Sequence, residues 1–264
     1  MKNIIKKITA AALALTLLGT GTLVRDNSNL VDNKQVITAD AASGGYIKYR
    51  DVNDYIAKVL KGQRGVRCMN YYVPTYHFMD FRYGRAHRGA YDIPNGMNCT
   101  VISVENLMVY YLRKNGFPAV TDAGYSYYYN GMMDLARNKY GYTDKSGLPV
   151  WNHRSFCQEA LRAYGHFSST PNVSTYSRSQ RSITLPNLPN KPFILSSTTT
   201  YHSVLVYSTV TWHLEYTTKQ GYKMSEDVDF LECYDPSGER FMVETGNIVD
   251  SWNDIEQVMY VTNY

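Results

Sequence analysis

Apolar residues recur every three or four positions over residues 98–112, which is the spacing of one buried helix face. The positions on this face are Val101, Val104, Leu107, Met108, Tyr111 and Leu112. Asn98 is a favourable N-cap residue type, and Gly116 followed by Pro118 is typical of a helix end. The pattern therefore predicts an amphipathic helix that begins at Cys99.

Three further stretches are predicted to be helical. They are residues 54–60, ended by Gly62, residues 131–140 and residues 155–164. The tyrosines at 125–129 come just before the second stretch. Clusters of this kind favour aromatic-rich β structure or an amphipathic surface groove.

After Gly165 the pattern changes from helices to strands. The following residues, 168–182, are rich in Ser and Thr and are expected to form a loop. Short apolar runs then predict strands at 192–196, 203–210, 228–234, 241–243 and 257–262. An extended segment is also expected at 71–81 and a loop at 82–98. Helices first and strands second indicate an α+β fold, with an N-terminal helical lobe and a C-terminal antiparallel sheet lobe.

The N-terminus has the features of a targeting segment. Lys2, Lys6 and Lys7 precede an apolar run at 8–24, and a small-residue cleavage pattern follows at 39–41. The run is short for a membrane-spanning helix, and an uncleaved anchor is the alternative. We expect a secreted protein whose mature form is not bound to a membrane.

These features divide the chain into three parts. We expect residues 1–41 to be a signal peptide and polar spacer, residues 42–66 an N-terminal extension, and residues 67–264 the functional domain. The chain is 44% hydrophobic and 19% charged, which permits a packed core. Its net charge is only +4 and its basic residues are dispersed, so no nucleic-acid partner is expected.

Four cysteines lie in the mature part, at Cys68, Cys99, Cys157 and Cys233. Their spacing is not that of a small disulfide-stapled domain, and if Cys99 is free one other must also be unpaired. No His/Cys pair has the local spacing of metal ligands, so neither a metal nor another cofactor is expected.

Cys99 is the candidate nucleophile. In the first turn of a helix, unpaired backbone N–H groups and the helix dipole favour the thiolate over the thiol. A buried structural thiol is the alternative, because free cysteine is often buried.

His202 and Asp235 are the candidate partners of Cys99. His202 stands at the start of a predicted strand, and Asp235 follows the next one, before Pro-Ser-Gly. If the two strands form a hairpin centred on 218–219, Asp235 lies opposite His202, where its carboxylate can fix the imidazole tautomer. A structural histidine and a simple turn-forming aspartate are the alternatives.

Five short motifs in this order resemble the papain-like cysteine peptidases, within them the bacterial double-glycine leader peptidase-like and staphopain-like branches. The motifs are Tyr-Val-Pro-Thr-Tyr at 72–76, Asn-Cys-Thr and its helix at 98–112, Lys-Pro-Phe-Ile-Leu-Ser at 191–196, Tyr-His-Ser-Val-Leu-Val-Tyr at 201–207 and Tyr-Asp-Pro-Ser-Gly at 234–238. The resemblance covers most of residues 70–264 and implies a papain-like fold there. It also implies Cys99 as nucleophile, His202 as general base and acid, and Asp235 as the orienting residue.

The chain departs from the family pattern at two places. Thr100 stands where the family usually has glycine, and no glutamine that could hold an oxyanion lies between Gln63 and Cys99. The candidates to replace that glutamine are the side chains of His77, Asn95 and Asn98, alongside the Cys99 backbone N–H.

The sequence thus leads to one main hypothesis and two alternatives. The main one is a secreted bacterial thiol protease that acts on protein or peptide substrates through a Cys-His-Asp triad and a thioester acyl-enzyme. The alternatives are a cell-wall peptide amidase and a catalytically impaired papain-like binding module. The sequence does not define the substrate specificity or the oligomeric state.

Overall fold

The structure is a computed structural model that describes residues 49–71, 97–177, 188–197, 202–236, 239–245 and 255–264. All of these belong to one compact unit, Ser43–Tyr264. The predicted targeting segment, the loop at 82–96 and all but the first residue of the extended segment at 71–81 lie outside the described residues. Among the described residues, no helix has the length and apolarity needed to cross a bilayer.

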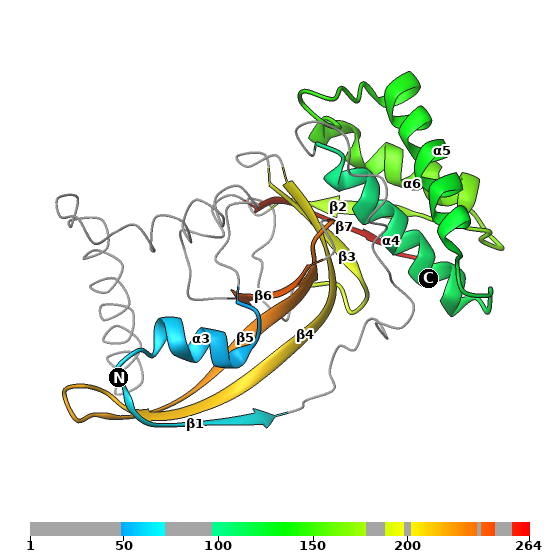
Figure 1. The fold of residues 1–264 in the computed structure, drawn as a ribbon. Coiled ribbons are helices and arrows are strands. Elements are labelled where there is room, and N and C mark those ends of the chain that lie inside the picture. The colour runs from blue at the N-terminus through cyan, green and yellow to red at the C-terminus, as the bar shows by residue number, and fades with distance from the viewer. Residues whose placement is uncertain (1–48, 72–96, 178–187, 198–201, 237–238, 246–254) are drawn as a thin grey trace. The chain divides into compact units, whose positions relative to one another are not determined.

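The described residues combine helices with one antiparallel sheet, which confirms the α+β class (Figure 1). The helices are α3 (Val52–Val59), α4 (Cys99–Lys114), α5 (Asp122–Tyr140) and α6 (His153–Tyr164), with a 3₁₀ turn, η2 (Val150–Asn152), before α6. The strands are β1 (Arg64–Tyr71), β2 (Val173–Tyr176), β3 (Phe193–Ser197), β4 (His202–Thr217), β5 (Lys223–Tyr234), β6 (Arg240–Thr245) and β7 (Ile255–Val261). The order in the sheet is β2-β7-β3-β4-β5-β6, and β1 pairs with the far end of β4.

Helix α4 begins at Cys99 as predicted, but it is buried on nearly every side rather than along one face. Positions 99–109 are all buried, as are Tyr111 and Leu112. At its end the N–H of Phe117 donates to the carbonyl of Leu112, and Gly116 takes φ +86°. This is a Schellman motif, and it satisfies carbonyls that the helix leaves without partners.

Helix α5 is longer than predicted and contains the tyrosine cluster that was expected to be β structure or a surface groove. Thr121 is its N-cap, and the Thr121 Oγ1 accepts from the N–H of Gly124 at 3.2 Å. Tyr125 and Tyr129, one helical turn apart, are both buried in the helical core. A good cap and this spacing outweigh the strand preference of tyrosine.

Two strands were missed in the sequence. β1 precedes the extended segment expected at 71–81, and β2 lies inside the predicted Ser/Thr-rich loop. β2 pairs with β7 from Val173↔Val261 to Tyr176↔Val258. Both strands depend on pairing with partners distant in sequence, which short-range patterns do not reveal. The strands β3 to β7 were predicted, with β4 and β5 longer than expected.

The β4–β5 hairpin has a different register from the predicted one. Its turn centres on Gln220, because Thr217 pairs with Lys223. A β-bulge between Val206 and Ser208 then shifts the pairing by one residue, so that Val206 pairs with Cys233.

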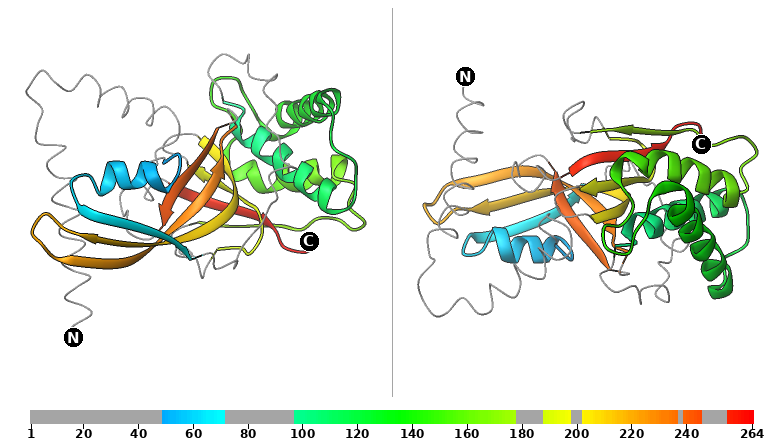
Figure 2. Two further views of the ribbon diagram at one scale, coloured as in Figure 1. Left: turned by 60° about the horizontal axis from the view of Figure 1, so that its bottom comes forward. Right: turned by 90° about the horizontal axis from the view of Figure 1, so that it is seen from above.

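Two hydrophobic cores cover one face of the sheet. The helices α4, α5 and α6 pack over Ile194, Leu205 and Met259, whereas α3 packs over Leu214 and Phe230 at the other end of β4 and β5. Val228, Phe230 and Tyr234 are an even number of residues apart along β5, so their side chains point to the same face of the sheet. Helix α3 and the helices α4 to α6 therefore lie on the same face (Figure 2). A third cluster, which includes Leu195, Val204 and Cys233, occupies the opposite face.

Candidate active site

The structure brings together the three residues that the sequence singled out. Cys99 is the first residue of α4, His202 the first of β4, and Asp235 follows the last residue of β5. The Nε2 atom of His202 lies 2.9 Å from the Oδ2 atom of Asp235. The His202 side chain is also hydrogen-bonded to the thiol of Cys99, and Nδ1 is the ring nitrogen left for that contact.

The β-bulge in β4 is what places His202 and Asp235 on one face of the hairpin. If the pairing seen from Ser208 to Thr217 continued to the start of β4 without a bulge, the side chains of His202 and Asp235 would lie on opposite faces, because side chains alternate along a strand. The extra residue in the bulge, Tyr207, shifts this alternation by one position, so that both side chains lie on the same face. The two side chains then lie diagonally, two positions apart, rather than directly opposite as predicted.

The electrostatic environment favours a charged Cys99–His202 pair. Burial opposes ionisation of Cys99, yet the hydrogen bond and charge of His202, with backbone hydrogen bonds from Ser203 and Thr100, hold the pKa of the thiol below its ordinary value. Burial likewise disfavours the imidazolium, but the hydrogen bonds to Asp235 and Cys99 raise the pKa of His202 to about 9. Each group stabilises the charged form of the other.

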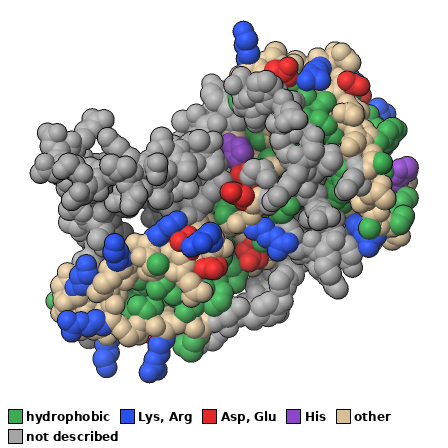
Figure 3. Space-filling view, viewed as in Figure 1, with side chains coloured by type: hydrophobic (Ala, Val, Ile, Leu, Met, Phe, Trp, Pro, Cys, Tyr) green, Lys and Arg blue, Asp and Glu red, His purple; other side chains and the backbone are tan. Residues whose placement is uncertain are grey.

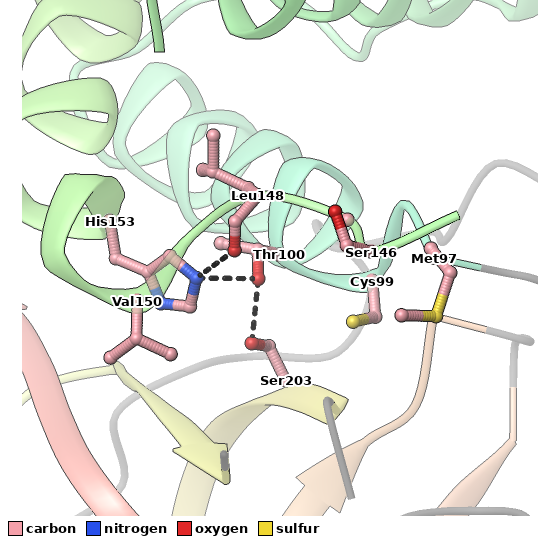
Figure 4. A pocket seen from close by; sticks show the side chains of 9 residues that line it. Met97, Cys99, Thr100, Ser146, Leu148, Val150, His153 and Ser203 are labelled. Atoms are coloured by element: carbon pink, nitrogen blue, oxygen red, sulfur yellow. Dashed lines mark hydrogen bonds between the residues drawn. The ribbon is translucent and has the colours of Figure 1, made fainter. Parts of the chain in front are cut away.

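Thr100 anchors the start of α4 to the sheet. Its Oγ1 lies 2.8 Å from the Oγ of Ser203 (Figure 4). The Oγ of Ser203 in turn lies 2.9 Å from the Oγ of Ser196. The Ser103 hydroxyl donates to the Ser203 carbonyl at 3.2 Å. Thr100 and Ser103 thus fix the start of α4 to Ser203, the residue next to His202.

His153, the first residue of α6, extends this network and was not identified from the sequence. Its Nε2 lies 3.0 Å from the Leu148 carbonyl and 3.3 Å from the Thr100 Oγ1. Because a carbonyl only accepts, Nε2 carries the proton and donates to Leu148. Burial lowers the pKa of His153 to about 4, so the ring is neutral at physiological pH. No local sequence pattern marks this histidine, since its two partners lie outside α6, in the loop before it and in α4.

A small pocket opens beside Cys99 and Thr100 (Figure 4). Its empty volume is about 270 Å³, the solvent at its mouth included. Further lining residues are Met97, Ser146, Gly147, Leu148, Val150, His153 and Ser203. Gly147 has φ +69°, and a Cβ on it would come 2.7 Å from the Met97 carbonyl oxygen. This glycine therefore lets the loop at 143–148 approach the residues just before Cys99.

The structure locates one of the three predicted oxyanion side chains. Asn98 is the N-cap residue of α4, but its side chain does not cap the helix. Instead the Asn98 Nδ2 donates to the Tyr129 hydroxyl at 2.8 Å in a buried position. Asn98 also does not line the pocket. His77 and Asn95 lie outside the described residues.

All four cysteines are free thiols. Cys157 and Cys233 are fully buried, and burial raises the pKa of Cys157 and of Cys68. Cys99 differs from Cys157 and Cys68 because its pKa is shifted downward. The described residues contain no cluster of three or more His, Cys, Asp or Glu side chains suited to a metal ion.

No protein-family description, curated protein or solved structure matches the chain.

Proposed function

We propose that the protein is a cysteine peptidase in which Cys99 is the nucleophile, His202 the general acid and base, and Asp235 the orienting residue. The observation that carries this proposal is the hydrogen-bonded series Cys99–His202–Asp235, formed by the first residues of α4 and β4 and the residue after β5. The papain-like resemblance of the sequence motifs supports the same roles.

In the acylation step, the Cys99 thiolate attacks the carbonyl carbon of a peptide bond. The C–N bond of the peptide breaks, and the imidazolium of His202 gives its Nδ1 proton to the leaving amine. The products of this step are a free amine and a thioester between Cys99 and the acyl part of the substrate. The carboxylate of Asp235 keeps the His202 ring oriented and stabilises its charged form.

In the deacylation step, His202 is neutral and acts as the base. It accepts a proton from water, the water oxygen attacks the thioester carbon, and the carbon–sulfur bond breaks. Cys99 leaves as the thiolate, and the charged Cys99–His202 pair is restored. The negative charge on the substrate oxygen in both steps lies near the first turn of α4, where backbone N–H groups and the helix dipole favour an anion.

Alkylation with iodoacetamide at mildly acidic pH, followed by peptide mapping, tests the nucleophile. We expect Cys99 to react at least tenfold faster than Cys68, Cys157 and Cys233, because only the thiolate reacts. His202→Ala is expected to remove this preference, and His213→Ala, on the same strand, to leave it unchanged. Equal labelling of all four cysteines would contradict the proposal.

Digestion of denatured casein and of purified peptidoglycan, side by side, tests the substrate class. Release of casein peptides by the wild type but not by Cys99→Ala is the expected result. Release of cell-wall peptides alone would indicate an amidase instead. Selective labelling of Cys99 with no hydrolysis of either substrate would indicate a catalytically impaired domain.

A further inference from the structure

The far end of the β4–β5 hairpin extends beyond the rest of the sheet. β3 pairs with β4 only as far as Val206, whereas β4 continues for eleven more residues to Thr217. At the usual rise per residue this is roughly 35 Å of strand. β1 pairs with this end of β4, and α3 packs over it through Tyr55 and Phe230, whose rings meet edge to face at 5.0 Å. We call this part, with β1 and α3, the hairpin arm.

Basic side chains that are dispersed in sequence gather at the tip of the hairpin arm. The tip consists of residues 60–64 and 216–225, which contain four cations and no Asp or Glu. The cations are Lys61, Arg64, Lys219 and Lys223, and all four are exposed. None has an ion-pair partner among the described residues. Figure 3 shows blue side chains along this end of the molecule.

The scaffold holds these cations in defined positions. Arg64 and Lys223 both lie opposite Thr217, so they occupy one row across three strands, about 10 Å apart. The Lys219 side chain packs over Gly62, and the Lys219 N–H donates to the Gln63 side chain at 3.0 Å. Binding therefore requires little ordering of the backbone that carries the charges.

The chemistry of the tip fits a linear anionic polymer. Four exposed cations on a protruding turn, with no ion-pair partner in the part of the chain that the structure describes, offer several contacts to a chain of repeated phosphates. Tyr222, 69% exposed, is the one exposed aromatic ring among the described residues of the tip, because Tyr216 is partly buried against the cluster beneath α3. A single ring gives no platform for successive stacked bases and little apolar surface for insertion into a bilayer.

We propose that the tip of the hairpin arm is a docking surface for a linear phosphodiester polymer without bases, such as a polyol phosphate. The surface is independent of the proposed catalytic triad, because none of its residues lines the pocket beside Cys99.

Fluorescence anisotropy with a labelled glycerol phosphate oligomer tests this proposal. With four phosphate contacts, wild-type affinity is expected to fall on the order of 50-fold for a fourfold rise in salt concentration. The quadruple variant Lys61→Gln, Arg64→Gln, Lys219→Gln and Lys223→Gln is expected to lose most of this salt dependence and to bind at least tenfold more weakly at low salt. Its circular dichroism and its rate of Cys99 alkylation should match the wild type, because the substituted side chains are exposed.

A matched control removes the same charge elsewhere. It combines Lys114→Gln, Lys139→Gln, Lys145→Gln and Arg162→Gln, all outside the hairpin arm. The control should bind the oligomer nearly as the wild type does. An equal loss of affinity for the oligomer in the two quadruple variants, or no binding of the oligomer by the wild type, would overturn the proposal.

Two further probes separate the polymer from other anionic surfaces. Binding to vesicles with anionic lipids but not to the oligomer, together with a loss of vesicle binding in Tyr222→Ser, would overturn the proposal in favour of a membrane contact. Tighter binding to a single-stranded oligonucleotide than to the glycerol phosphate chain would also overturn it, since recognition would then depend on the bases. Tyr222→Ser is expected to leave binding of the glycerol phosphate oligomer within about twofold of the wild type.

Discussion

The Cys99–His202 pair sets the pH range in which the proposed reaction runs. Catalysis requires an ionised Cys99 and a protonated His202, and the pKa of His202 is raised to about 9 by Asp235 and Cys99. We therefore expect kcat/KM to stay high through neutral pH and to fall above about pH 9. Asp235→Asn should move this fall to lower pH and reduce kcat/KM on the order of 100-fold, because the carboxylate no longer stabilises the imidazolium.

The control for this prediction is Asp227→Asn, which removes an exposed carboxylate from β5, the strand that ends just before Asp235. Its pH profile should follow that of the wild type. If the fall of kcat/KM at high pH does not move in Asp235→Asn, a group other than the His202–Asp235 pair controls that fall. The measurement is the pH dependence of kcat/KM on a peptide substrate.

Glu105 is a second residue whose ionisation is shifted by its position. It lies fully buried in α4, neither carboxylate oxygen has a hydrogen-bond partner among the residues that the structure describes, and burial raises its pKa to about 8. The folded state therefore holds a proton that the unfolded chain releases above about pH 4.5. Stability from this proton is complete at lower pH and is lost progressively as the pH rises toward 8.

Glu105→Gln removes this pH dependence, because the amide does not ionise. Relative to the wild type, its free energy of unfolding should increase by about 3 kcal/mol between about pH 5 and pH 8. Urea denaturation at the two pH values measures this change, and comparison of the two proteins cancels the other titrating groups. A difference that stays constant with pH would mean that the carboxyl group does not change its proton occupancy on folding.

At the scale of the elements, the pocket loop depends on one glycine. Gly147→Ala introduces a side chain at φ +69° and in collision with the Met97 carbonyl, so the loop must move away from Cys99. We expect kcat/KM to fall on the order of tenfold or more, since small misplacements near a reacting centre are costly. Gly221→Ala is the matched control, because it has φ +89° but open space around the new Cβ. A similar loss of activity in both variants would assign the effect to backbone strain rather than to the pocket.

The elements also show what local sequence patterns can predict. The apolar spacing of α4, with Gly116 after it, lies within one segment, so that helix was predicted nearly to its bounds. β2 is a Ser/Thr-rich segment that becomes a strand only through its pairing with β7. The start of α5 depends on the Thr121 cap, which a cluster of tyrosines obscured.

The candidate site was predictable to the extent that each residue lies at an element boundary. Cys99 and His202 begin a helix and a strand, and Asp235 precedes a turn, so local patterns identified all three. The network around Thr100 was not predictable, because Ser203, Ser196 and His153 come from three other elements. The hairpin register was wrong for a related reason, since the bulge at Tyr207 leaves no local signal.

At the scale of the whole unit, β4 and β5 run through both the helical core and the core beneath α3. Continuous strands couple the two cores, so the whole unit, the hairpin arm included, is expected to unfold in one transition. Phe230 is fully buried beneath α3 and packs edge to face against the rings of Tyr49 and Tyr55. Phe230→Ala should reduce the free energy of unfolding by about 3–5 kcal/mol through the cavity it leaves.

The test follows thermal unfolding by circular dichroism and, in parallel, by the alkylation of buried Cys157 in α6. If the cores are coupled, Phe230→Ala lowers both midpoints together, and Phe156→Ala in the helical core produces a shift of similar size. Below the transition, the rate of Cys99 alkylation should not change, because Phe230 contacts neither Cys99 nor the pocket. An early transition in Phe230→Ala that leaves Cys157 protected would show instead that the hairpin arm unfolds independently of the proposed catalytic core.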